Sequence, residues 1–73
     1  MQNGGASPRR PLNAREKKFL RDLYDQAREA ALAKGIDAAG ARRLALSTAA
    51  LLGTRGLDRQ LSAEEVARAV GPG

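Results

Sequence analysis

The residues best suited to chemistry in this chain are the cations near its N-terminus. Six basic side chains and a single carboxylate fall within residues 1–21, whereas basic and acidic residues balance over residues 22–73. The net charge of +5 is therefore carried by the first segment. Clustered arginine and lysine neutralise phosphates and gain affinity by releasing counterions. The segment predicts an anionic partner, with the candidate binding residues Arg9, Arg10, Arg15, Lys17, Lys18 and Arg21.

A second pair of cations, Arg42 and Arg43, follows in the interior of the chain. We expect this pair near the start of a helix, where the helix dipole disfavours positive charge, so both join the candidate binding residues. Two alternatives stay open. The pair could be ordinary solvated surface, and the N-terminal cations could serve only to keep the protein soluble.

Catalytic chemistry has few residues available in this chain. There is no cysteine and no histidine, which removes disulfides, thiol nucleophiles and the usual base and zinc ligand at neutral pH. The carboxylates of Asp22, Asp25 and Glu29 lie within a helical turn of arginine or lysine, which is typical of surface ion pairs. We therefore predict a protein that is not an enzyme and needs no metal or cofactor.

The elements that position these residues are predicted to be helices, because no segment alternates as a strand does. Two capping boxes, in which an Asn or Ser is followed three residues later by Glu, mark helix starts. They are Asn13 with Glu16 and Ser62 with Glu65. Gly35 and Gly53 are expected to end the first and second helices. The predicted helices span about residues 14–34, 38–52 and 63–70.

The predicted organisation is a flexible basic arm, residues 1–12, followed by a small all-α domain, residues 13–73. The first two helices are expected to pair as an αα-hairpin. A chain of this length makes at most one domain and buries only about 60% of its unfolded surface. Its stability is therefore expected to be marginal.

The second helix is predicted to supply the core. No residue between Leu44 and Leu52 is charged, and a helix that is apolar nearly all round is buried or lies at an interface. We expect Leu51→Ala to leave a cavity that costs about 2–5 kcal/mol. The same helix is a candidate homodimer interface. No apolar run is long enough to span a membrane, and a cytoplasmic location is expected.

Residues 19–56 comprise the stretch from Phe19 through Ile36 and then the run LALSTAALLGTRG, which starts at Leu44. This stretch resembles the opening helices of the glucosaminidase domains of flagellar and phage muramidases. Those domains carry a catalytic glutamate where this chain has Leu52, and a tryptophan where it has Arg55. Because a leucine cannot protonate a glycosidic oxygen, the resemblance implies a non-catalytic remnant.

Residues 61–71, with the sequence LSAEEVARAVG, resemble the first helix of helix-turn-helix modules in excisionase and MerR-type regulators. The resemblance implies a DNA-binding module, but the recognition helix that should follow is missing after Gly71.

These observations support three functional hypotheses. The first is a small basic protein that binds nucleic acid and regulates a nucleic-acid process such as transcription, as phage, plasmid or bacterial accessory regulators do. The second is a protein–protein adaptor or inhibitor that docks on a larger enzyme through its exposed apolar residues, with the basic arm serving only to steer it to an acidic partner surface. The third is the muramidase-like remnant. The sequence leaves the choice between the first two open.

Overall fold

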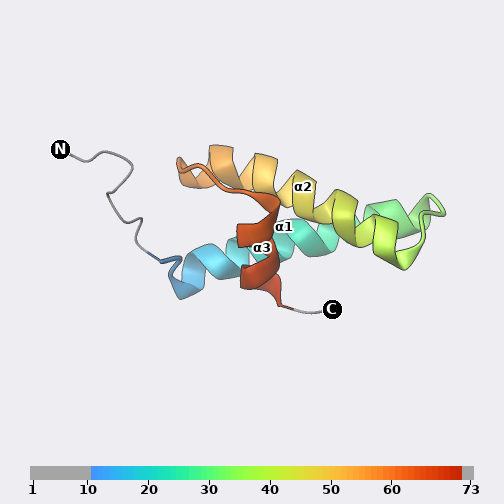
Figure 1. Ribbon diagram of the computed structural model, residues 1–73, viewed down its shortest axis with the longest axis horizontal. Coiled ribbons are helices and arrows are strands. Elements are labelled where there is room, and N and C mark those ends of the chain that lie inside the picture. Colours follow the sequence, from blue (N-terminus) through green and yellow to red (C-terminus); the bar gives the residue numbers. More distant parts are fainter. Residues whose placement is uncertain (1–10, 72–73) are drawn as a thin grey trace.

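Three α-helices make up residues 11–71, the part of the chain that the computed structural model describes (Figure 1). They are α1, Ala14–Ala33; α2, Ala38–Leu57; and α3, Ala63–Val70. No strand occurs within this described range, which confirms the predicted all-α fold. Most of the predicted arm, with Arg9 and Arg10, lies outside the described residues.

Side-chain caps set the starts of α1 and α3, as the sequence predicts. Asn13 Oδ1 accepts a hydrogen bond from Glu16 N at 2.8 Å, and Glu16 Oε1 accepts one from Asn13 N at 3.0 Å. Ser62 and Glu65 make the same reciprocal pair at 3.2 and 3.0 Å. Each box satisfies two backbone positions that the helix itself leaves unpaired.

The end of α2 differs from the prediction. The helix continues through Gly53 and Gly56 to Leu57, and it stops at Asp58, whose φ of 52° is left-handed. The two glycines serve packing instead of termination. A Cβ on Gly53 would run into the Leu20 side chain and lie 3.1 Å from Leu61 Cδ1. A Cβ on Gly56 would lie 2.8 Å from Phe19 Cζ.

The helices are arranged as an antiparallel hairpin crossed by a short third helix. α1 and α2 run side by side, and α3 lies across both of them (Figure 1). The hairpin turn passes through Gly35, whose φ of 89° favours glycine. The expected αα-hairpin is therefore present. None of the helices within residues 11–71 combines the length and hydropathy needed to cross a membrane.

The core is built mainly from small residues of α2. Ala41, Ala45 and Ala49 are spaced one turn apart and are all 0% exposed. Leu20 of α1 and Val66 of α3 are the largest fully buried side chains of the described residues. The hairpin helices approach closely because alanine and glycine line the side of α2 that faces α1.

The second helix supplies core residues, as predicted, but these are mainly its alanines, and the expectation that Leu51 is buried and that Leu51→Ala leaves a cavity is wrong. Leu44, Leu51 and Leu52 are 48%, 56% and 41% exposed, and only Leu46 packs against the core as a partly buried side chain. The alanine face allows a closer helix contact than the leucine face, which consequently turns outward.

Candidate functional site

The outward side of α2 carries an apolar surface without charge. We call Leu44, Thr48, Leu51 and Leu52 the outer stripe of α2. Thr48 lies four residues after Leu44, and Leu51 and Leu52 lie three and four residues after Thr48, so the four share one side of a helix with 3.6 residues per turn. The charge-free run on which they lie extends from Leu44 to Thr54.

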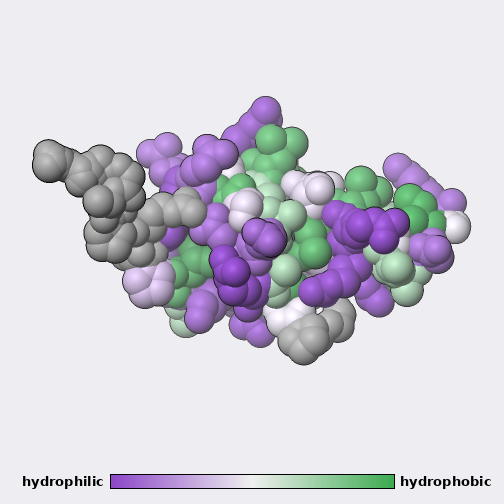
Figure 2. All heavy atoms as spheres, viewed as in Figure 1, coloured by the Kyte–Doolittle hydropathy of each residue, from purple (hydrophilic) through white to green (hydrophobic). Residues whose placement is uncertain are grey.

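The outer stripe contrasts with the neighbouring surface. Figure 2 shows hydrophobic side chains emerging along the upper edge of the view, over α2, whereas hydrophilic side chains cover much of the face around α3. A single exposed leucine on a protein surface needs no explanation, whereas several on one helix face make a candidate contact surface.

A second apolar feature lies between the start of α1 and the end of α2. Phe19 is 37% exposed and its ring sits against Gly56. The ring borders a hollow of about 380 Å³, which is lined by Asn13, Arg15, Glu16, Phe19, Gly56 and Leu57. Exposed apolar groups therefore occur at this end of the hairpin as well as along α2.

The predicted cations of α1 are exposed on its first two turns, but they do not form one narrow face. Lys17 and Lys18 lie four and three residues before Arg21, so the three are neighbours on the helix surface, and Arg15, three residues before Lys18, extends them around the helix. Lys18 Nζ pairs with Asp22 Oδ2 at 3.1 Å in an exposed ion pair. The first half of α1 is therefore basic over a broad part of its circumference and not along one narrow stripe.

The other predicted cations, Arg42 and Arg43, lie in the second turn of α2, near the end of α1 and away from its basic first turns (Figure 1). Arg42 Nη1 donates to Tyr24 Oη at 3.1 Å, and Nη2 donates to the carbonyl of Gly71 at 3.4 Å. Its guanidinium also lies 5.8 Å from the centre of the Tyr24 ring. Arg42 thus links all three helices, whereas Arg43 is exposed.

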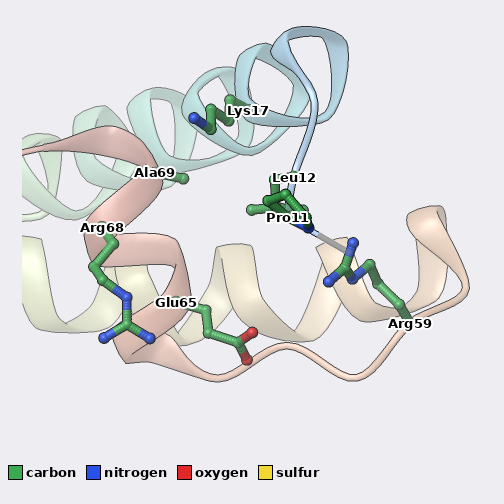
Figure 3. Close-up of a pocket in the computed structure, with 7 residues that line it drawn as sticks. All are labelled: Pro11, Leu12, Lys17, Arg59, Glu65, Arg68 and Ala69. Atoms are coloured by element: carbon green, nitrogen blue, oxygen red, sulfur yellow. The ribbon is translucent and has the colours of Figure 1, made fainter. Parts of the chain in front are cut away.

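Further cations, which sequence reasoning missed, meet Lys17 around a shallow cavity of about 270 Å³. Arg59 comes from the connection after α2, and Arg68 comes from α3 (Figure 3). The remaining lining residues are Pro11, Leu12, Glu65 and Ala69. Glu65 Oε1 accepts a hydrogen bond from Ser62 N at 3.0 Å, and the cavity lining contains three cations and this one acid. No sequence signal joins these residues, because they come from three separate segments.

Comparison with known proteins finds no family model, no curated relative and no solved structure that matches this chain. Within residues 11–71 there is also no group of three carboxylates that could hold a metal ion. The candidate surfaces are therefore interpreted from their own geometry.

Proposed function

We propose that this protein is a non-enzymatic interaction module that binds another protein chain through the outer stripe of α2. The observation that carries the proposal is the exposure of Leu44, Leu51 and Leu52, which are each about half exposed on one helix side. Covering such leucines removes apolar surface from water, worth about 25 cal/mol per Å² buried. A helix that presents anchors at this spacing is a common way for helical proteins to recognise one another.

The folded chain gives a physical reason for this arrangement. Its interior is filled largely by alanine, so the domain holds few large buried side chains. Most globular domains use their leucines to stabilise themselves, whereas this one leaves three of them on the surface of α2. That placement favours the adaptor or inhibitor hypothesis over the hypothesis based on charge alone.

A nucleic acid or other anionic partner is the second candidate. It is favoured by the exposed cations on the first two turns of α1 and by the three cations around the cavity in Figure 3. Because phosphate contacts release counterions, log K for duplex DNA would fall against log salt with a slope of about −0.9 for each phosphate neutralised. Replacing Arg9 and Arg10 by alanine would flatten the slope by about two.

One experiment separates the two candidates. Tagged wild-type chain, Leu51→Gln and the control Arg43→Gln are used to capture partners from lysate that also contains the untagged chain, with and without nuclease. Leu51 and Arg43 are both exposed on α2 but point in different directions. We expect nuclease-resistant partners that Leu51→Gln loses and Arg43→Gln retains. Partners that vanish with nuclease and ignore Leu51→Gln would favour the anionic candidate and contradict the first.

The remaining hypotheses stay predictions. A cytoplasmic location is one of them. The muramidase-like remnant receives no support from a specific contact, since the position of the catalytic glutamate is occupied by Leu52, whose exposed side chain carries no acid.

A further inference from the structure

Oppositely charged residues flank the outer stripe of α2. Asp37, the N-cap of α2, and Arg55, in its last turn, are 18 residues apart, which is five full turns. Both residues therefore lie on the same side of the helix as Leu44 and Leu51. Both are exposed, and within residues 11–71 the structure shows no ion pair for either.

This pattern is complementary to itself in one direction. If a second α2 packs antiparallel with the twofold axis near Leu46, Asp37 of each copy meets Arg55 of the other. The same register places Leu44 beside Thr48, and it brings Leu52 to the level of Gly40, where Asp37 Oδ1 accepts a hydrogen bond from Gly40 N at 2.7 Å and the Ile36 side chain lies close by. A parallel arrangement would instead place like charges together at both ends, which is destabilising.

We infer that the protein chain bound by the outer stripe is a second copy of this protein, packed antiparallel along α2. The inference rests on the proposed function, since it names the partner of the same surface. A second copy, packed antiparallel, presents Arg55 to Asp37, Asp37 to Arg55, and apolar residues to the outer stripe between them. No unrelated partner with the same order of groups is needed. The twofold contact is isologous, the commonest arrangement in homodimers.

The contact is small. A contact between one helix of each copy buries a surface area at or below the lower end of the range that is typical of specific interfaces, about 1,200–2,000 Å². We therefore expect an equilibrium between monomer and dimer, with Kd on the order of tens of micromolar. The exposed cations on the first two turns of α1 remain outside the helix side used in this contact.

Sedimentation equilibrium of the full chain from about 1 µM to 1 mM tests the inference. Wild-type protein is expected to dimerise, and Leu51→Gln is expected to raise Kd at least about tenfold, since Gln keeps helix propensity but removes the apolar contact. Arg43→Gln is the control and is expected to leave Kd unchanged. A monomer at 1 mM, or a dimer indifferent to Leu51→Gln, overturns the inference.

A double-mutant cycle tests the antiparallel register. Asp37→Asn keeps an N-cap residue, and Arg55→Gln removes the opposite charge. Each change alone is expected to raise Kd about two- to fivefold, and the double variant is expected to raise it no further than a single one. Additive effects would contradict contact between Asp37 and Arg55. Circular dichroism at low concentration checks that each variant is folded.

The outcomes also separate this inference from the proposed function. If wild-type protein stays monomeric while Leu51→Gln still abolishes nuclease-resistant capture, a different protein occupies the outer stripe and only the inference fails. If neither self-association nor capture responds to Leu51→Gln, both fail.

Discussion

At the scale of single residues, a large apolar side chain in this protein can be either buried or exposed. Leu20 is 0% exposed, whereas Leu51, a residue of the same type on a neighbouring helix, is 56% exposed. Sequence periodicity identified the apolar character of α2 but could not choose between its alanine side and its leucine side, because both repeat with the helical period. The choice depends on how closely α1 can approach, which is a tertiary property.

This contrast predicts different costs for the same substitution. Leu20→Ala should destabilise the fold by about 2–5 kcal/mol, because it removes a fully buried side chain. Leu51→Ala should change the stability of the monomer by no more than about 0.5 kcal/mol, since the side chain is largely in water. Thermal melts at low protein concentration compare the two. A large loss for Leu51→Ala would mean that the outer stripe is part of the core.

Arg42 also differs from its neighbour in sequence. It was a candidate ligand-binding residue, and the structure gives it hydrogen bonds to Tyr24 and to the carbonyl of Gly71. These contacts explain, without a ligand, why Arg42 lies near the start of a helix. They do not involve Arg43, which remains a candidate binding residue.

We expect Tyr24→Phe and Arg42→Lys each to cost about 1 kcal/mol of unfolding free energy, because each breaks the hydrogen bond between the two side chains. Their combination should cost less than the sum, since both remove the same contact. Urea denaturation of the two single variants and the double variant measures this coupling. Equal stability of Arg42→Lys and the control Arg43→Lys would contradict a structural role for Arg42.

At the scale of helices, local chemistry predicted the starts better than the ends. The capping boxes of α1 and α3 depend on residues three positions apart, so the sequence contains all the information needed. Gly53 was interpreted as a stop signal, but it lies against Leu20 and Leu61 inside a continuous helix. A sequence does not show whether a glycine ends a helix or lets another helix approach it.

The two glycines of α2 should therefore respond differently to alanine. Alanine favours helix over glycine by about 1 kcal/mol at either position. At Gly53 the new Cβ would meet buried Leu20, and overpacking of about 1–3 kcal/mol should outweigh that gain. At Gly56 the obstacle is Phe19, which is 37% exposed and can move aside. Thermal melts should show a lower midpoint for Gly53→Ala than for Gly56→Ala, and the reverse order would refute this account of the packing.

At the scale of the whole molecule, the all-α class, the hairpin and the second helix as a candidate homodimer interface were predictable, whereas the residues that the proposed interface exposes were not. Composition identified the candidate cations. The sequence could not show that Lys17 lines the same cavity as Arg59 and Arg68, because that arrangement depends on tertiary packing. The sequence did not predict that Asp37 and Arg55 flank the outer stripe on the same side of α2, and the reason is specific. Arg55 aligns with Asp37 only because α2 continues past Gly53, where the sequence analysis ended it.

The central claim is that the outer stripe of α2 contacts a second copy of the chain, and leucine-methyl NMR of the full protein tests it most directly. Spectra recorded from about 20 µM to 1 mM span the expected Kd. Methyl signals of Leu44, Leu51 and Leu52 should shift with concentration, while those of buried Leu20 stay fixed. Concentration-independent signals from the three outer leucines would contradict the account.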